Sequence, residues 1–454
     1  MAIQSIIASI DAHQEEISGL SQKIWENPEI GWKETQAVRW ICEVLERNGF
    51  SAEAGAYGMP TAIRAVWGSG RPVVGFCAEY DCLPGLSQKA CPYPDPVTPG
   101  GFGHGCGHNL LGAGCVGAAI ALKEALEKEG KAGTVILYGC PAEELESGKG
   151  WMAKAGAFSE CDFTIAWHPA GENRDSYGEH MSIEEASFRF RGTTAHAASH
   201  AYLGRSALDA VQLMNIGCEF LREHVTDDVR IHYSITDGGG AANVVPGFAE
   251  VSYMIRALSR ETVVDAFNRV VKCAEGAAHM TETAVTVLRK GGFYPTLQNH
   301  VIGEAVQEAR AEIPVEEYTE EELDFADRIN RCYPEYREGV TPPMSSTDRE
   351  ISHAPIYQST DYGDVQHICP GFQVREACAP TLYRAHSWSM TASAGASIGR
   401  KGMLRAAKLM AAAAYKLMTD PERLQAAKDE FASRMGGKVY ECPLSDELPW
   451  PYKD

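Results

Sequence analysis

The sequence predicts an α/β fold in which a mixed, largely parallel sheet is sandwiched by helices and a smaller α+β domain is inserted. Strands that are apolar on both faces alternate with helices in the first part of the chain, as in a buried parallel sheet. After about residue 182 the order of elements changes to β-α-β-β-α-β. The length of 454 residues is about three times that of a typical domain, which favours more than one domain.

The first part of the chain contains helices and strands in regular alternation. Apolar residues at helical spacing predict a helix from Ile3 to Ile24, which Asn27-Pro28 ends. A second amphipathic pattern predicts a helix over Val38–Leu45 that ends at Asn48-Gly49. The elements expected next are the strand Val73–Ala78, a Gly/Ala-rich helix over Leu110–Glu129, and the strands Thr134–Cys140 and Phe163–Trp167.

The inserted domain is predicted from a split βαβ order, which is typical of a small ferredoxin-like domain. Its expected elements are the strand Ala186–Arg191, the helix Arg205–His224, the strands Arg230–Ile235 and Ala249–Ile255, the helix Thr262–Met280 and the strand Ala284–Leu288. We therefore expect the main domain at residues 1–182 and 297–454, and the insert at 183–296. The main domain should end in the helix Met403–Met418. The acidic stretch 311–327 is interpreted as a solvated helix face or loop.

Composition narrows the class of protein. The chain is 44% hydrophobic and 22% charged, which excludes disorder, collagen and coiled coil. Its 41 Lys and Arg against 61 Asp and Glu give a net charge of −20, which repels nucleic acid and anionic membranes. The N-terminus has no signal-peptide pattern, no apolar run reaches about 18 residues, and fourteen cysteines are scattered. We expect a cytoplasmic protein with reduced thiols and no transmembrane helix.

Four places in the sequence carry residue types that suit metal chemistry. GHGCGH, at Gly103–His108, opens the long helix, and PAEE places Glu143 and Glu144 just after a strand. His168 ends another strand, and RAHSWS places His386 far downstream. Each place alone has an ordinary structural explanation. Three of them fall where ligands gather in open α/β sheets, at the ends of elements, and together they favour a site.

Thiolate, imidazole and carboxylate groups together are the ligand set of a borderline divalent ion such as Zn²⁺, with Mn²⁺ or Co²⁺ as alternatives. Adjacent glutamates suit hydrolysis, because consecutive residues after a strand point in different directions. One of them can bind the ion while its neighbour takes a proton from a metal-bound water and passes it to a leaving amine.

Seven motifs together resemble the M20 metallopeptidase family, and within it the aminoacylase-like branch of amidohydrolases. They are FCAEYDCLPG, GHGCGHNLLGAG, PAEE, WHP, GTTAHAA, NVVPG and RAHSWS. The resemblance runs through nearly the whole chain. It implies a zinc-exopeptidase-like catalytic domain, an inserted lid and dimerisation domain, and two divalent ions in each copy of the chain, Zn²⁺ or Mn²⁺.

The resemblance also assigns residues. The implied metal ligands are Cys106, His108, Glu144, His168 and His386. Glu143 matches the general base, and Asp81 matches a residue that fixes the tautomer of a ligand imidazole. In the insert, His196 and Asn243 match residues that reach the site of a neighbouring copy and polarise the scissile carbonyl. Arg256 matches an arginine that grips the substrate carboxylate. Which ligand serves which ion stays open.

Two departures from the family pattern concern the substrate rather than the metal. Glu79 and Cys82 stand in a string that is more often Ala-Asp-Met-Asp-Ala-Leu-Pro. Asn109 replaces the aspartate that usually follows Cys-Gly-His.

The resemblance implies a metal-dependent amidohydrolase that cleaves linear amides in N-acyl or N-aroyl amino acids, such as p-aminobenzoyl-glutamate, with metal-bound hydroxide and Glu143 as base. One alternative is a dipeptidase or a deacylase with a different acyl preference. Another is an inactive metal-binding member of a hetero-oligomer, against which the intact Glu143 counts. The expected partners are a small-molecule substrate and a second copy of the chain, or a homologous chain. The acyl group, the amino acid and the native metal stay open.

Overall fold

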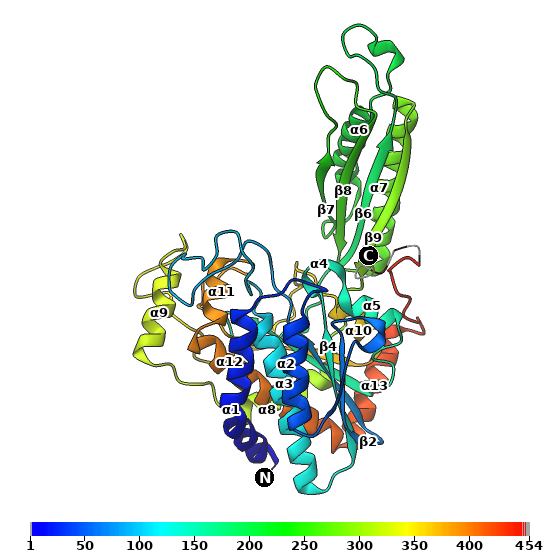
Figure 1. Cartoon of the computed structure of the whole chain (residues 1–454). Helices are drawn as coiled ribbons and strands as arrows, with labels where there is room; N and C mark the ends of the chain where they lie inside the picture. Colours follow the sequence, from blue (N-terminus) through cyan, green and yellow to red (C-terminus); the bar gives the residue numbers. More distant parts are fainter. Residues whose placement is uncertain (1, 447, 449, 451–454) are drawn as a thin grey trace.

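Two sheets organise the chain, one in a helix-covered body and one in an arm that projects from it (Figure 1). The computed structural model describes residues 2–446, 448 and 450. The arm comes from the middle of the chain, and the segments before and after it together build the body. The boundaries at 182 and 296 remain predictions, although the arm's strands begin at Ser182 and end at Phe293.

The body contains a six-stranded sheet of order β1-β2-β4-β3-β5-β10. Strands β4, β3, β5 and β10 are parallel to one another, whereas β1 and β2 add an antiparallel edge. The sheet is therefore mixed and largely parallel, as the sequence predicts. Its strands are β1 Ser51–Ala54, β2 Ile63–Ser69, β3 Val73–Glu79, β4 Gly133–Cys140, β5 Phe163–Ala170 and β10 Gly371–Ala377.

Helices cover both faces of this sheet. Alternate residues of β3 face opposite cores: Phe76 packs in the larger cluster, with side chains of α1, α2, α3, α8 and α12, and Cys77 packs in the smaller one, with α5 and α10. This double covering explains why β3 and β4 are buried along their whole length. The helices of the body are α1 Ala2–Glu26, α2 Thr35–Arg47, α3 His108–Glu129, α4 Glu143–Glu146, α5 Gly148–Lys154, α8 His300–Glu312, α9 Glu320–Asn330, α10 Tyr362–Gln366, α11 Trp388–Ala394, α12 Ser397–Met418 and α13 Pro421–Met435.

Helix α3 lies at the centre of the larger core. By length and composition it could cross a membrane, but 89% of its most apolar window is buried inside the protein, as expected of a core helix. Its glycines allow close packing on the sheet: a Cβ at Gly112 would lie 2.7 Å from the Glu79 carbonyl oxygen, and one at Gly114 would lie 2.9 Å from the Trp167 ring. This close approach brings His108, at the start of the helix, to the carboxyl ends of the strands.

The arm is built around a four-stranded antiparallel sheet of order β7-β8-β6-β9. Helices α6 and α7 pack on the sheet, and a core that includes Met214, Phe188 and Phe267 lies between them and the strands. Order and connectivity match the split βαβ pattern predicted from the sequence. The elements are β6 Ser182–Arg191, α6 Ala207–Leu221, β7 Arg230–Asp237, β8 Phe248–Ala257, α7 Arg260–Thr281 and β9 Ala284–Phe293.

The acidic stretch 311–327 leads into α9, which begins with a capping box between Thr319 and Glu322. Glu320 and Glu321 are exposed in its first turn, where negative charge is favourable at a helix N-terminus. None of these residues lines the large cavity described below.

Candidate metal centre and active site

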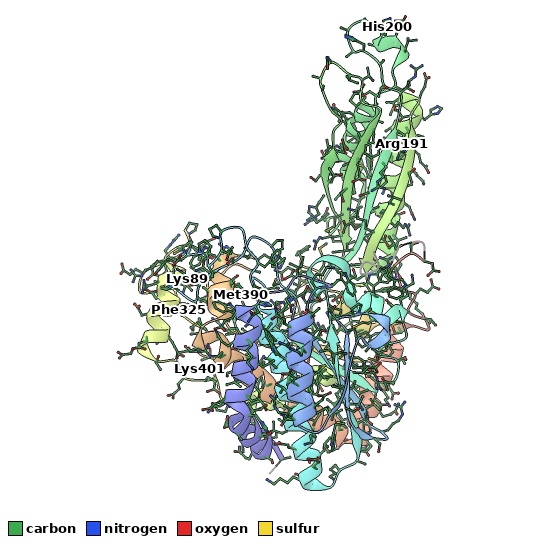
Figure 2. The ribbon with its side chains drawn as sticks, in the orientation of Figure 1. Lys89, Arg191, His200, Phe325, Met390 and Lys401 are labelled. Atoms are coloured by element: carbon green, nitrogen blue, oxygen red, sulfur yellow. The ribbon has the colours of Figure 1, made fainter. Side chains whose placement is uncertain are left out.

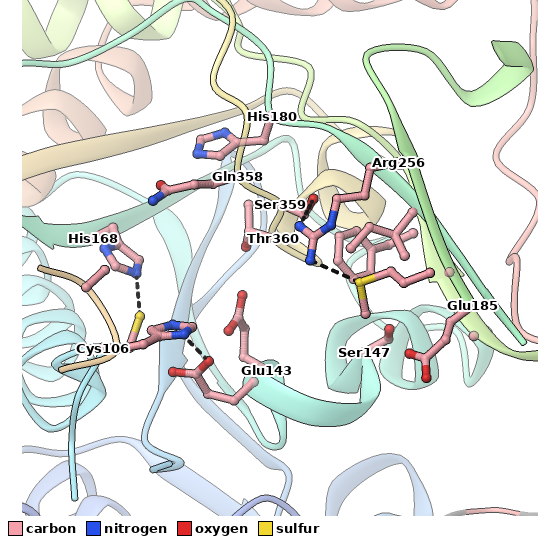
Figure 3. Close-up of a pocket in the computed structure, with 18 of the residues that line it drawn as sticks. Cys106, Glu143, Ser147, His168, His180, Glu185, Arg256, Gln358, Ser359 and Thr360 are labelled. Carbon is pink, nitrogen blue, oxygen red and sulfur yellow. Dashed lines mark hydrogen bonds and ion pairs between the residues drawn. The ribbon is translucent and has the colours of Figure 1, made fainter. Parts of the chain in front are cut away.

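A cavity of about 830 Å³ opens where the carboxyl ends of the body strands meet the base of the arm. Figure 3 shows Cys106 and His168 on one side of this cavity, and Arg256 and Ser359 on the other. Glu143 lines it as well. The body thus supplies the predicted metal ligands, and the arm contributes Arg256 from β8.

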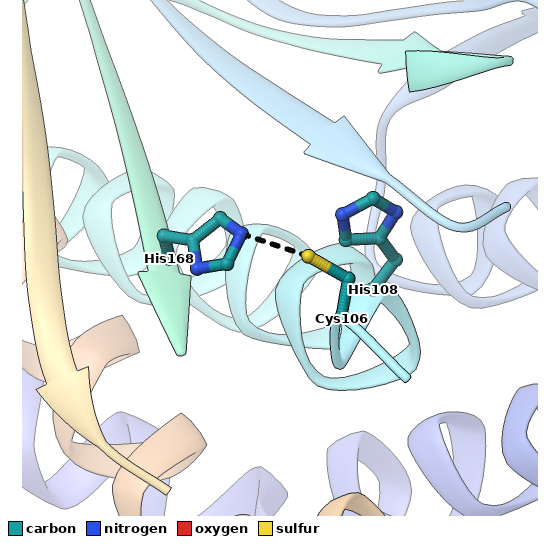
Figure 4. Close-up of side chains that lie close together, drawn as sticks. All are labelled: Cys106, His108 and His168. Carbon is teal, nitrogen blue, oxygen red and sulfur yellow. Dashed lines mark hydrogen bonds between the residues drawn. The ribbon is translucent and has the colours of Figure 1, made fainter. Parts of the chain in front are cut away.

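Cys106 and His108 are held by a tight turn at the start of α3. Gly107 between them adopts φ 82°, and a Cβ there would lie 2.5 Å from Met390, so only glycine fits. The turn brings donor atoms of Cys106, His108 and His168 within 4.8 Å of one another (Figure 4). The Cys106 Sγ to His168 Nε2 distance is 3.3 Å. These three side chains form a first potential metal-binding group.

A second potential group consists of Cys106, Glu144 and His386, whose donor atoms also lie within 4.8 Å of one another. Glu144 Oε2 is 3.3 Å from His386 Nε2. The loop that carries His386 is fixed by a hydrogen bond from its main-chain N–H to the Gly105 carbonyl, 2.9 Å long, and His386 adopts φ 55°. Such strained backbone is typical of functional sites. Cys106 belongs to both groups.

Asp81 connects the two groups from beneath. His108 Nδ1 donates to Asp81 Oδ1 over 2.8 Å, and the main-chain N–H of Glu144 donates to Asp81 Oδ2 over 3.0 Å. Two buried donor atoms are left without a hydrogen bond among the described residues, His108 Nε2 and Glu144 Oε1. Unsatisfied buried polar atoms are costly in a folded protein. Their convergence with a thiol and further imidazoles fits a bound divalent ion.

The electrostatics of the site reflect crowding of negative groups. Burial, and then the charges of Glu79 and Asp361, raise the pKa of Glu143 well above its ordinary value. Burial also raises the pKa of Glu144, to about 7. Burial alone would lower the pKa of His108, but the negative charges of Cys106 and Asp81 raise it well above the ordinary value. A cation bound among these groups would relieve this repulsion.

A buried lysine lies behind the site, and the sequence reasoning missed it. Lys149 Nζ is 2.5 Å from Glu79 Oε1 and 2.6 Å from Asp361 Oδ1, and all three side chains are almost fully buried. Glu79, His108 and Glu143 form a third cluster of donor atoms within 4.8 Å. The sequence marked Glu79 only as a departure from a family pattern. Its position at the carboxyl end of the buried strand β3 was the available signal.

The predicted substrate residues fall in two places. Arg256 lines the cavity, and its Nη1 donates to Ser359 Oγ over 2.9 Å. His196 and Asn243 do not line it. They are exposed together in loops of the arm, where the Ala197 N–H donates to the Asn243 carbonyl over 2.9 Å. Figure 2 labels the nearby His200 at the far end of the arm.

Comparison with known proteins gives consistent relatives. The pattern of Peptidase family M20/M25/M40 matches residues 75–361. One of the chains that form the p-aminobenzoyl-glutamate hydrolase of Escherichia coli (strain K12) is 37% identical, over 98% of each chain. The Xaa-Arg dipeptidase of Homo sapiens is 28% identical, over 94% of this chain and 91% of its own.

Solved structures share the fold. A dinuclear metal-binding peptidase of the M20 family from Bacillus subtilis has a TM-score of 0.62 at 17% identity, over 90% of this chain and 99% of its own. The family match covers more than half of the chain, and the E. coli relative is similar along nearly all of it. The protein therefore belongs to peptidase family M20/M25/M40 and is a hydrolase of amide bonds.

Proposed function

We propose that the protein is a metal-dependent amidohydrolase that cleaves N-acyl or N-aroyl amino acids, with p-aminobenzoyl-glutamate-like compounds as its substrate class. The observation that carries the proposal is the convergence of Cys106, His108 and Glu144 with two imidazoles beside the free carboxyl of Glu143. The E. coli relative is named as a p-aminobenzoyl-glutamate hydrolase, which supports the substrate class.

The metal-binding groups support a centre for two ions, Zn²⁺ or Mn²⁺. Cys106, His108 and His168 would hold one ion, and Cys106, Glu144 and His386 the other, so that the Cys106 sulfur serves both. The mixed sulfur, nitrogen and oxygen donors suit borderline metals better than Mg²⁺ or Ca²⁺. When bound, such ions act as Lewis acids that lower the pKa of a coordinated water and polarise a carbonyl.

Glu143 is placed to move the proton during hydrolysis. Its carboxylate lines the cavity, and Oε2 is 4.0 Å from His108 Nε2, at the edge of the ligand groups rather than inside them. A raised pKa allows this carboxylate to accept a proton from the attacking water and then to release it to the leaving nitrogen. Asp81 holds His108 in the tautomer that a ligand requires.

Arg256 would hold the carboxylate of the amino acid. Burial lowers the pKa of its guanidinium, which donates to Ser359 and has no carboxylate partner among the described residues. A guanidinium can bind a carboxylate through two parallel hydrogen bonds, which fixes the orientation of the scissile amide relative to Glu143.

The exposed pair His196 and Asn243 supports an assembly in which one copy of the chain completes the site of another. His196 Nδ1 accepts from the main-chain N–H of Ala198 and of Ser199, so its hydrogen resides on Nε2, which is free to donate to an oxyanion. We therefore favour a homodimer through the arm. A heteromer is the alternative, because another chain of the E. coli hydrolase is also similar, at 30% identity over 48% of this chain and 53% of its own.

The fourteen cysteines, which all lie in the described part of the chain, are free thiols. Free thiols persist in a reducing compartment, which supports a cytoplasmic location.

A screen of amide substrates tests the function. Metal-depleted protein is reloaded with Mn²⁺ or Zn²⁺ and assayed for amine release from p-aminobenzoyl-glutamate, an N-acetyl amino acid and a dipeptide. We expect metal-dependent turnover with p-aminobenzoyl-glutamate as the best of the three. A preference for the dipeptide would favour a dipeptidase, the activity that the human relative's name gives.

Glu143→Ala provides the matched control for the screen. It should lose roughly 10²- to 10⁴-fold in turnover while metal content stays at the wild-type level, because Glu143 moves a proton and does not hold the ion. Absence of turnover of every amide by fully loaded wild-type protein would favour a metal-binding protein without activity of its own.

A further inference from the structure

Arg375 enters the cavity from β10, beside the predicted ligand His168. The two residues are register partners on parallel strands, so their side chains leave the sheet on the same face. Gln373, two residues earlier, lines the cavity too, whereas Phe372 and Val374 pack in the core on the opposite face. Arg375 therefore forms part of the cavity wall on the body side.

The main chain of Arg375 is fixed by a buried ion pair. Its N–H donates to Asp175 Oδ1 over 2.8 Å, and its carbonyl accepts from Arg310 Nη2 over 2.7 Å. Asp175 and Arg310 are buried and joined to each other by two further hydrogen bonds, of 2.6 and 2.9 Å. The strand is thus anchored through its backbone, and the guanidinium of Arg375 is not needed for this anchoring.

The guanidinium of Arg375 has neither a hydrogen bond nor an ion pair within the described part of the chain. By contrast, the buried Arg310 contacts Asp175, Asp348 and Glu376. Arg375 is half-buried, and its charge is felt by His168 and His180, whose pKa values burial and nearby positive charges lower. A partly desolvated cation without a partner is unfavourable unless a ligand supplies the anion.

The cavity thus contains two arginines without a carboxylate partner among the described residues, Arg375 from the body and Arg256 from the arm. Lys290 also lines it, but its Nζ lies 3.5 Å from the carboxylate of Glu185. Two uncompensated guanidinium groups in one cavity stand out in a chain with a net charge of −20. Such a pair would attract and orient a ligand with two negative groups.

We propose that Arg375 binds the side-chain carboxylate of a dicarboxylic amino acid, while Arg256 holds the main-chain carboxylate. The inference rests on the proposed function, in which the acyl half is a neutral aryl group and both carboxylates therefore belong to the amino acid. Arg375 is then the residue that selects an acidic side chain. An isosteric amide in the same place would leave the guanidinium without its anion.

The test compares N-benzoyl-glutamate with N-benzoyl-glutamine, which differ only in the side-chain group, a carboxylate in one and an amide in the other. For the metal-loaded wild-type enzyme we expect kcat/KM to be roughly 10- to 100-fold higher with the glutamate compound, because a charge-assisted hydrogen bond is lost with the amide. Arg375→Met should remove most of this preference by reducing kcat/KM for the glutamate compound and leaving the glutamine compound nearly unchanged. Arg375→Lys should keep part of it.

Lys290→Met is the matched control, because it removes a cavity cation that already has a carboxylate partner. Its ratio of the two kcat/KM values should equal that of wild type, and thermal melting should show that all variants are folded. Equal use of both compounds by wild type, or an unchanged ratio in Arg375→Met, overturns the inference alone. Turnover of neither compound by the loaded wild-type enzyme overturns the proposed function, and the inference falls with it.

Discussion

Asp81 Oδ1 lies 2.8 Å from His108 Nδ1, and this contact decides which nitrogen of the buried imidazole faces the potential ligand groups. The hydrogen resides on Nδ1, so the lone pair of Nε2 points away from Asp81. Nε2 is buried and without a hydrogen bond among the described residues, 3.3 Å from Glu79 Oε2 and 3.9 Å from Glu144 Oε1. A carboxylate behind a histidine in this way typically orients a metal ligand.

We predict that Asp81→Asn weakens metal binding roughly 10- to 100-fold without unfolding the protein. The amide can accept from His108, but its NH₂ group then faces the main-chain N–H of Glu144, which now donates to Asp81 Oδ2. Metal affinity, measured by competition with a chelator, checks this expectation. Asp95→Asn is the control, since Asp95 is paired with Lys89 in a surface loop. Equal affinities in both variants would remove Asp81 from the site.

Cys106→Ser should lower metal affinity and turnover together, and the loss should include both ions. The reason is that Cys106 belongs to both ligand groups and that a serine hydroxyl ionises far less readily than a thiol at a metal. Metal content per chain, followed during dialysis, is the measurement.

Cys91→Ser and Cys442→Ser control for the general effect of losing a thiol, since neither cysteine lies in a ligand group. Both should retain wild-type metal content. Full stoichiometry of two ions in Cys106→Ser would exclude the shared sulfur, and loss of only one ion would assign Cys106 to a single group.

Glu34 should make the protein less stable as the pH rises from about 5 to about 8. It is fully buried beneath the loop that carries Glu143, and its Oε1 accepts from the main-chain N–H of Ala142 over 2.8 Å. Burial, and then the charge of Asp81, raise its pKa from 4.5 to about 8. In this window the unfolded carboxyl has lost its proton and the folded one retains it, so each rise in pH favours unfolding.

Glu34→Gln keeps an acceptor for the Ala142 N–H and removes the titration, so its melting temperature should fall less than that of wild type over this window. Thermal melting at pH 5, 6.5 and 8 at a constant metal concentration measures the difference. Glu53→Gln, which changes an exposed carboxyl on β1, should follow the wild-type curve. Parallel curves for wild type and Glu34→Gln would show that Glu34 is already ionised in the folded protein.

Much of the fold was predictable because buried strands and amphipathic helices leave clear periodic patterns. The strands that were missed lack such patterns. Strand β1 is short and mostly exposed, and β2 lies near the antiparallel edge of the sheet. In β10 the core residues Phe372 and Val374 alternate with Gln373 and Arg375, which line the cavity. The polar residues that hid this strand are the ones that the site uses.

The site was predictable only in part, for a similar reason. The ligand types stand in compact motifs, and the close-packed α3 brings Cys106 and His108 to the strand ends as expected. Lys149 and Arg375 could not be found in this way, because a lone cation in a sequence does not show whether it is buried or paired. Their positions follow from contacts between segments far apart in the chain, such as Lys149 with Asp361.

The last prediction concerns His196, which is exposed on the arm and does not line the cavity of its own chain. If it serves a neighbour's site, two inactive variants should restore each other when they are assembled together. His196→Ala retains Glu143 and the metal ligands but lacks the group that would contact the neighbour's oxyanion. Glu143→Ala retains His196 but has no base. A mixed dimer combines the intact Glu143 of one chain with the intact His196 of the other at one of its two sites.

Random pairing makes about half of the dimers mixed, and each mixed dimer has one complete site, so activity should return to about a quarter of the wild-type value. The two variants are co-expressed with different tags, and the mixed dimers are purified through both tags and confirmed by mass. The purified mixed dimers should then show about half of the wild-type activity per dimer, because one site in two is complete. Verified mixed dimers without activity would mean that His196 acts within its own chain or takes no part in the reaction, and the arm would then have only a structural role.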